Sequence, residues 1–203
     1  MIGAVLAGGR GARMGGGGKA TVLLRGRPLV ERAVAALAPV VGEERVVVVA
    51  NRDTPLPGGL AAPVWEDEAA EDDHHPRHGI VRALRGAAGA PVLVLAVDLP
   101  CMDAATLAGL RDAGALARED GPGGRVQPLC GVYGPEALAP LAAAPPGEPL
   151  TRTVLERLRP PLLDVPGALL LNVNVPGDLA RAEALGSPPA CEPSPPPSRS
   201  APP

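Results

Sequence analysis

The chain has 203 residues, 46% of them apolar, and this length and composition suit a single globular domain with a buried core. A formal net charge of −3 and only two aromatic residues, Trp65 and Tyr133, argue against a broad nucleic-acid surface. Cys101, Cys130 and Cys191 form no Cys-x-x-Cys pair, and neither a signal peptide nor a membrane-spanning apolar run is visible, so we expect a reduced, cytoplasmic protein without a zinc knuckle, a disulfide framework or a membrane segment.

The chain opens with a short apolar run, residues 2–7, which predicts a buried strand that leads directly into a glycine-rich loop. The loop, Gly8 to Lys19, holds seven glycines and three cations, Arg10, Arg13 and Lys19 itself. Because glycine has no Cβ, its backbone can take positive φ and approach a ligand closely, and bare N–H groups can form an anion nest. We therefore interpret the loop as a phosphate cradle. The alternative is a flexible linker, but linkers rarely follow a strand directly or carry three cations.

Two well-known nucleotide loops do not match this segment. A Walker loop needs Ser or Thr after its Gly-Lys pair, whereas Ala20 follows Lys19 here. The dinucleotide-binding fingerprint needs a glycine three residues after Gly11, and Met14 stands at that position. The pattern therefore predicts a nucleotide loop of a third kind.

Further along the chain, apolar runs alternate with segments whose apolar residues recur at helical spacing. After a short apolar segment at 21–24, the predicted strands are residues 45–50, 63–65, 91–97, 125–133 with a break near Pro128, 162–165 and 169–173. The first predicted helix begins at Pro28 and ends before Pro39. Further helices are predicted over residues 79–88, from an Asp103 N-cap to Leu116, over residues 135–141 and over residues 149–158. A last predicted helix ends near Gly186.

This alternation predicts an α/β fold: a Rossmann-like, three-layer α/β/α domain with a mostly parallel, mixed central sheet. Residues 1–186 would form that domain. Residues 187–203 are mainly Pro, Ser and Ala, and we expect a disordered tail without chemistry.

Polar residues follow three of the predicted strands directly, namely Asn51, Asp67 and Asp98. Ligands of open α/β sheets bind beyond the carboxyl ends of the strands, which is also the edge where the glycine loop begins. A carboxylate at a strand tip is held rigidly and suits Mg²⁺, so Asp98 is the strongest metal candidate. The alternative for Asp98 is helix capping or loop hydrogen bonding.

Three histidines, His74, His75 and His78, lie close to several carboxylates. His75 and His78 have the spacing of one helical turn, but Pro76 lies between them and favours a loop. We therefore expect a solvated loop rather than a transition-metal site, with substrate binding as the other alternative.

The segments Leu6-Ala-Gly-Gly-Arg-Gly-Ala-Arg-Met-Gly15, Lys19-Ala20 and Gly26-Arg-Pro-Leu29 resemble the N-terminal signature of the nucleotidyltransferases. The resemblance is closest to the molybdenum cofactor guanylyltransferases, the MobA-like group, and it covers roughly residues 1 to 185. It implies the fold of the nucleotide-diphospho-sugar transferases and a cofactor, Mg²⁺. The implied reaction transfers GMP from GTP to the terminal phosphate of molybdopterin and releases pyrophosphate.

The resemblance also implies residue roles. Contacts to GTP would come from strand ends and the loop: Leu6, Ala7, Gly8, Gly9, Lys19, Asn51, Asp67 and Asp98. Catalysis would rest on Arg13, Lys19 and Asp98, and Asp98 would hold the metal. Glu66 or Glu68 is the alternative to Asp67. Molybdopterin contacts would come from Gln127, Asn172 and Asn174, unless the two asparagines only satisfy loop backbone.

Three positions depart from the family pattern. Gly18 stands where an aspartate usually precedes the loop lysine, residues 75–79 replace a Gly-Pro-Leu-x-Gly segment, and Val175 replaces a threonine. Two other functions therefore stay open: a related nucleotidyltransferase that uses CTP or another phosphorylated acceptor, and a nucleotide-binding relative without turnover. We expect a monomer with GTP and molybdopterin as its small-molecule partners, transient contacts with other proteins of molybdenum cofactor synthesis, and no contact with nucleic acid or membrane.

Overall fold

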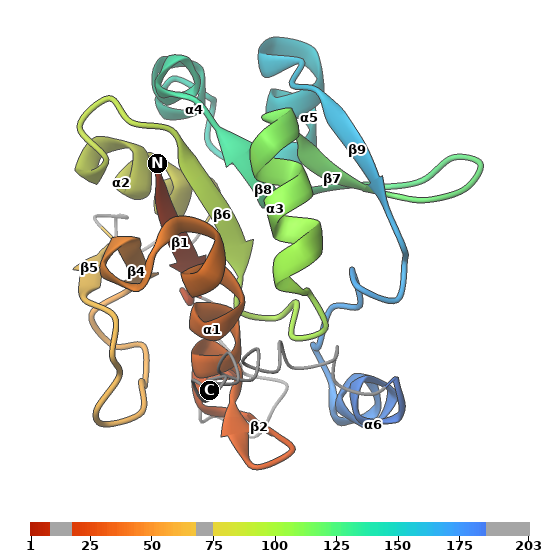
Figure 1. The fold of residues 1–203 in the computed structure, drawn as a ribbon. Coiled ribbons are helices and arrows are strands. Elements are labelled where there is room, and N and C mark those ends of the chain that lie inside the picture. Colours follow the sequence, from red (N-terminus) through yellow and green to blue (C-terminus); the bar gives the residue numbers. More distant parts are fainter. Residues whose placement is uncertain (9–17, 68–74, 186–203) are drawn as a thin grey trace, which may run out of the picture.

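The structure of the protein, a computed structural model, describes residues 1–8, 18–67 and 75–185. Its main sheet has seven strands: β1 Ile2–Leu6, β4 Val46–Ala50, β5 Val64–Glu66, β6 Val92–Ala96, β7 Leu116–Glu119, β8 Val126–Tyr133 and β9 Leu162–Val165 (Figure 1). A separate hairpin joins β2 Leu23–Leu24 to β3 Arg27–Pro28. The α-helices are α1 Leu29–Val41, α2 Arg77–Gly86, α3 Ala104–Ala113, α4 Leu138–Ala142, α5 Leu150–Arg152 and α6 Pro176–Ala184. Shorter helical turns are η2 Lys19–Thr21, η3 Glu43–Arg45, η4 Pro135–Ala137 and the π-helical η5 Thr153–Leu158.

The sheet order is β5-β4-β1-β6-β8-β7-β9, and β8 runs antiparallel to both of its neighbours while the other pairings are parallel. The prediction of a mostly parallel, mixed sheet is therefore confirmed. The continuous apolar sequences of β4 and β6 explain their central places, because each strand is buried on both faces. The parallel strands β1, β4 and β6 consequently end at one edge of the sheet.

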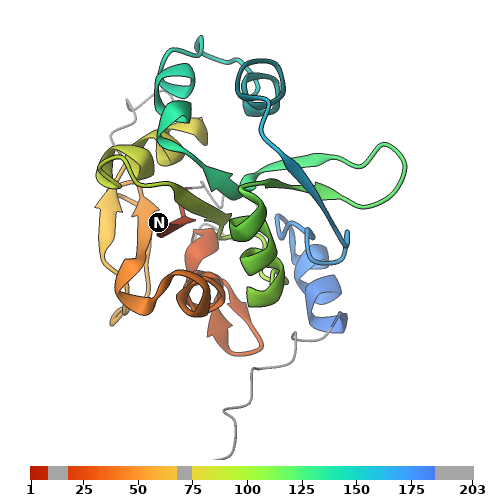
Figure 2. The same ribbon diagram turned by 45° about the horizontal axis from the view of Figure 1, so that its top comes forward.

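Helices cover both faces of the sheet and complete three layers (Figures 1 and 2). On one face α1 and α3 bury Leu37, Leu107 and Leu110. On the other, α2 and α4 bury Ile80 and Leu141. These side chains recur at the spacing that brings one face of a helix to the core, which is why periodicity predicted the helices.

Several predicted elements differ from the structure. The helix after Asp103 ends at Ala113, because Gly114 takes the left-handed conformation (φ 59°) and caps it, so Leu116 begins strand β7 instead. Residues 169–173 are not a strand, because the backbone turns there with bonds from Leu169 and Leu170 to the carbonyls of Pro166 and Gly167. Helix α1 does not end before Pro39 but continues through this exposed residue to Val41.

The predicted break near Pro128 takes the form of a register shift within one continuous strand. The first residues of β8, Val126 and Gln127, pair with β7, whereas residues 130–133 pair with β6. The register with β7 shifts in between, so that Leu116 lies opposite Gly131. Such a bulge bends a strand, and Gln127 lies in the part of β8 that precedes the bulge.

We expect Gly131→Ala to lower the free energy of unfolding by about 2–3 kcal/mol, because two costs combine at this position. Gly131 has φ 139°, and a Cβ there would lie 2.4 Å from the Ala115 carbonyl oxygen and 2.6 Å from the Leu116 Cα. Urea denaturation measures the change, with Gly58→Ala as the control because a Cβ at Gly58 meets no atom within 4 Å. Equal stability of the two variants would contradict this account of the bulge.

Among the described residues, no helix combines the length and apolar character needed to cross a membrane. The predicted tail, residues 187–203, and the predicted phosphate contacts Gly9 and Arg13 lie outside the described residues.

Candidate active site

The carboxyl ends of β1, β4 and β6 form one wall of a pocket of about 230 Å³. The lining brings together residues far apart in sequence that had been singled out as candidates: Leu6, Gly8, Lys19, Asn51, Asp67 and Asp98. Ala7 is buried and is not part of this lining, and its N–H donates to the Val49 carbonyl (2.8 Å). The convergence that strand order predicts is therefore present, since adjacent parallel strands deliver their following residues to the same edge.

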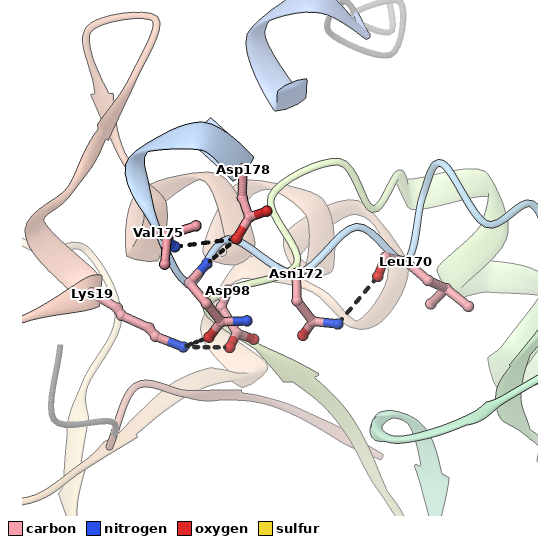
Figure 3. Close-up of polar contacts among 7 residues, drawn as sticks. Lys19, Asp98, Leu170, Asn172, Val175 and Asp178 are labelled. Carbon is pink, nitrogen blue, oxygen red and sulfur yellow. Dashed lines mark hydrogen bonds and ion pairs between the residues drawn. The ribbon is translucent and has the colours of Figure 1, made fainter. Parts of the chain in front are cut away.

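Lys19 and Asp98, which both line this pocket, form an ion pair (Figure 3). Lys19 Nζ lies 2.8 Å from Asp98 Oδ2, and the two side chains are only 17% and 18% exposed. Lys19 Nζ also donates to Asn174 Oδ1, which belongs to the segment before α6. The ammonium thus joins the start of the chain, the tip of β6 and the C-terminal part of the described chain.

Two glycines keep the pocket open. A Cβ at Gly8 would lie 3.2 Å from Asn51 Oδ1, and one at Gly79 would lie 3.2 Å from Leu6 Cδ2. Because distances of 3.2 Å are shorter than ordinary carbon contacts, a side chain at either position would make Asn51 or Leu6 shift slightly. A larger residue there would therefore change the shape of the pocket.

Gly18, the departure just before the lysine, has a structural reason. Its φ is 74°, and a Cβ there would lie 2.9 Å from Pro55 Cδ in the loop that follows β4. An aspartate at this position would be strained and would clash with the proline ring. The glycine therefore fits the local backbone of this chain, and Lys19 still reaches Asp98.

Three acidic residues at and after the end of β5 are candidates for the donor site, and the structure describes two of them. Asp67 lines the pocket, and its N–H donates to the Ala50 carbonyl (2.9 Å). Glu66 instead pairs with Arg52 (2.9 Å), and its side chain is 55% exposed. Glu68 lies outside the described residues. Asp67 is thus the better candidate of the two described.

A second, more polar pocket of about 460 Å³ contains Gln127, Asn172 and Asn174. Gln127 Oε1 accepts from the Leu129 N–H (3.3 Å), and Asn172 Nδ2 donates to the Leu170 carbonyl (3.3 Å). Each side chain therefore satisfies backbone but also faces the pocket. Asn174 lines this pocket and contacts Lys19 of the first, so the two pockets adjoin at Lys19, Asp98 and Asn174.

Four charged residues also line the second pocket, and sequence reasoning missed three of them as pocket residues: Glu119, Arg125 and Arg181, with Asp178 the fourth. Arg125 is two residues before Gln127, and Arg181 lies on α6. Neither arginine belongs to a recognisable motif. Only the packing of β7, β8 and α6 around one space reveals them.

The departure at Val175 does not prevent α6 from starting. Asp178 Oδ2 accepts from the N–H groups of Asn174 (3.0 Å) and Val175 (3.1 Å), and a carboxylate in the first turn also interacts favourably with the N-terminal end of the helix (Figure 3). This bond also fixes the backbone of Asn174.

The histidine segment is partly helical, contrary to the expectation of a loop, because α2 begins at Arg77, directly after Pro76. His75 lines the first pocket, and its Nδ1 accepts from the Arg77 N–H (3.3 Å). His78 lines a different cavity beside Arg82 and Arg85. His74 lies outside the described residues.

Within residues 1–8, 18–67 and 75–185, no three His, Cys, Asp or Glu side chains gather into a metal cluster. Asp98 therefore offers a single carboxylate, and this donor set fits Mg²⁺, which is commonly held by one or two carboxylates together with substrate phosphates and water. The described cysteines are free, and burial raises the pKa of Cys101 and raises that of Cys130 to about 12. Neither is suited to act as a thiolate nucleophile.

An open α/β sheet with a pocket beyond β1, β4 and β6 that is lined by a lysine–aspartate pair is typical of a nucleotide-binding enzyme. The chain belongs to the MobA-like NTP transferase domain family, whose sequence profile matches residues 3–164. The resemblance recognised in the sequence is thereby confirmed.

Curated relatives agree with this assignment. The chain is 40% identical over 193 residues to a molybdenum cofactor guanylyltransferase of Cereibacter sphaeroides, covering 91% of this chain and 96% of the relative. It is 35% identical over 208 residues to the 2-C-methyl-D-erythritol 4-phosphate cytidylyltransferase of Deinococcus radiodurans, covering 88% and 86%. The solved structure of molybdopterin-guanine dinucleotide biosynthesis protein A from Archaeoglobus fulgidus has the same fold, with a TM-score of 0.65 at 24% identity over 91% of this chain and 98% of that one.

Proposed function

We propose that the protein transfers GMP from GTP to the terminal phosphate of molybdopterin and releases pyrophosphate. The observation that carries this proposal is the pair of adjoining pockets with Lys19, Asp98 and Asn174 between them. A donor nucleotide and a phosphorylated acceptor need two such sites, with charge neutralisation where their phosphates meet. The names of the curated guanylyltransferase relatives support the same reaction.

The chemistry needs no dedicated general base. A phosphate monoester has a second pKa of about 6, so the acceptor is already an anionic nucleophile at neutral pH. One of its oxygens forms a bond to the α-phosphorus of GTP, and the bond from that phosphorus to the bridging oxygen of the β-phosphate breaks. Lys19 neutralises charge on the triphosphate and the leaving pyrophosphate, and Arg13 of the glycine loop is proposed to do the same.

Asp98 is the residue that would hold Mg²⁺, with the remaining ligands from phosphates and water. The bound cation would neutralise the phosphate oxygens and order the triphosphate for in-line attack. Lys19 contacts one carboxylate oxygen of Asp98, so Lys19 would have to share or release that oxygen when the metal binds.

The donor would lie along the first pocket with its phosphates near Gly8 and the Lys19 ammonium. The base would then lie near Asn51 and Asp67. The acceptor would occupy the second pocket, where Gln127, Asn172 and Asn174 offer both donors and acceptors to the edges of a pterin.

The carboxylate of Asp67 favours guanine over cytosine. Guanine presents two adjacent donors, N1–H and N2–H₂, which one carboxylate can accept together, whereas cytosine presents a single donor beside an acceptor. CTP is the second candidate donor, because one curated relative is a cytidylyltransferase.

We expect Asp67→Asn to weaken GTP binding about ten- to a hundredfold, which corresponds to the loss of a charge-assisted contact worth about 1.5–3 kcal/mol. The same variant should gain affinity for xanthosine triphosphate, since the new amide can donate to the carbonyl at position 2 of xanthine. Calorimetric titration with GTP, CTP, ATP, UTP and XTP measures both effects. Glu66→Gln is the matched control, because Glu66 faces Arg52. Tighter binding of CTP than GTP by the unaltered protein would overturn the proposed base preference.

A further inference from the structure

The contact between Asn174 and Lys19 crosses from the acceptor pocket to the donor pocket. Lys19 Nζ donates to Asn174 Oδ1 and to Asp98 Oδ2, and the second of these distances is 2.8 Å. Asn174 lines the second pocket but not the first, whereas Lys19 and Asp98 line the first. Asn174 is therefore the residue through which the acceptor side touches the phosphate-binding lysine.

Both sides of Asn174 are tied to the rest of the protein. The N–H of Val173 donates to the Asp98 carbonyl (2.8 Å), which fastens the segment to the tip of β6. Asp178 Oδ2 accepts from the N–H groups of Asn174 (3.0 Å) and Val175 (3.1 Å), which fastens it to the start of α6 (Figure 3). A backbone held at both ends presents the Asn174 amide in a defined position.

The neighbouring asparagine behaves differently. Asn172 Nδ2 donates to the Leu170 carbonyl (3.3 Å), and Asn172 lines the second pocket (Figure 3). No hydrogen bond between Asn172 and Lys19 occurs in the described part of the chain. The two asparagines, which are two positions apart in the sequence, therefore have separate surroundings.

We propose that Asn174 is a positioning residue for the donor nucleotide, which holds the Lys19 ammonium toward the triphosphate from the acceptor side. This inference rests on the proposed function and goes beyond the assignment of Asn174 to molybdopterin. The amide oxygen is neutral, so it can hold Lys19 while a metal and phosphates compete for Asp98. Without it, the flexible four-carbon stem of Lys19 keeps its rotamer freedom, and the ammonium pairs with Asp98 alone.

The test is calorimetric titration with nucleoside triphosphate and Mg²⁺ in the absence of any acceptor. Asn174→Ala is expected to weaken GTP·Mg²⁺ binding about tenfold, as the loss of one hydrogen bond to a charged group predicts. Asn172→Ala should leave this affinity unchanged, although its turnover with molybdopterin should fall. Equal melting temperatures of the two variants would exclude a general loss of structure.

A double-mutant cycle shows whether Asn174 acts through Lys19. Adding Asn174→Ala to Lys19→Ala should cause no further loss of GTP·Mg²⁺ affinity. Two results would overturn the inference: wild-type affinity in Asn174→Ala, which would leave Asn174 with the acceptor alone, or an undiminished effect in the Lys19→Ala background. The cycle uses whichever triphosphate the unaltered protein binds, so a preference for CTP would contradict the proposed function and leave the test of Asn174 intact.

Discussion

Asp98→Asn is expected to reduce turnover to below about 1% of the unaltered protein. The substitution keeps the size of the side chain but removes the one carboxylate at the end of the donor pocket that lies against Lys19. Removal of a residue that only supports a metal ligand commonly lowers metal affinity or activity about 10–100-fold, so loss of the proposed ligand itself should cost at least as much. The fold should survive, because an amide oxygen can still accept from Lys19 and the Asp98 side chain is partly exposed in the pocket.

Pyrophosphate release at saturating Mg²⁺ measures this effect, and a thermal melt checks the fold. Asp164→Asn serves as a matched control, since Asp164 is an exposed partner of Arg118 on an edge strand (2.6 Å). Near-normal turnover of Asp98→Asn would remove Asp98 from the metal-binding role. A parallel loss in Asp164→Asn would show that the assay responds to any change of charge.

Lys19→Ala is expected to weaken GTP affinity or turnover about ten- to a hundredfold, the equivalent of one charge-assisted contact of about 1.5–3 kcal/mol. Lys19 is the described cation that lines the donor pocket, and it is held there by Asp98 and Asn174. Lys19→Arg should rescue poorly, because a planar guanidinium does not replace a compact ammonium that has two partners at one nitrogen.

Titration of Lys19→Ala with GTP·Mg²⁺, and separately with molybdopterin, distinguishes the two substrates. GTP binding should suffer far more than pterin binding. Arg45→Ala is the control, because Arg45 is 59% exposed and pairs with Glu44 in the turn before β4. Unchanged GTP binding together with collapsed pterin binding would mean that the lysine serves the other pocket.

The sequence predicts the donor half of the site well because its determinants are local. An apolar run followed by a polar residue identifies a strand and its tip, and adjacent parallel strands end at one edge. Asn51, Asp67 and Asp98 therefore meet in one pocket, as expected. The wrong boundaries also have local causes: the apolar Leu116 continues the spacing of α3, and only the left-handed Gly114 shows that the helix has ended.

The acceptor half depends on contacts that no local pattern encodes. Lys19 and Asn174 are 155 positions apart, and their contact requires the tie between Val173 and the tip of β6. The role of Gly18 is likewise decided by Pro55, a residue in another loop. Arg125 and Arg181 enter the second pocket through the bend of β8 and the placement of α6, which side-chain periodicity does not predict.

The most direct test of the proposed reaction is pyrophosphate release from each of the four nucleoside triphosphates, labelled at the α-phosphate, with and without molybdopterin. The two adjoining pockets predict release only when GTP and molybdopterin are present together, with one label transferred to the pterin for each pyrophosphate released. Release from CTP in preference to GTP, release that does not depend on molybdopterin, or nucleotide binding without any release would contradict the proposed function.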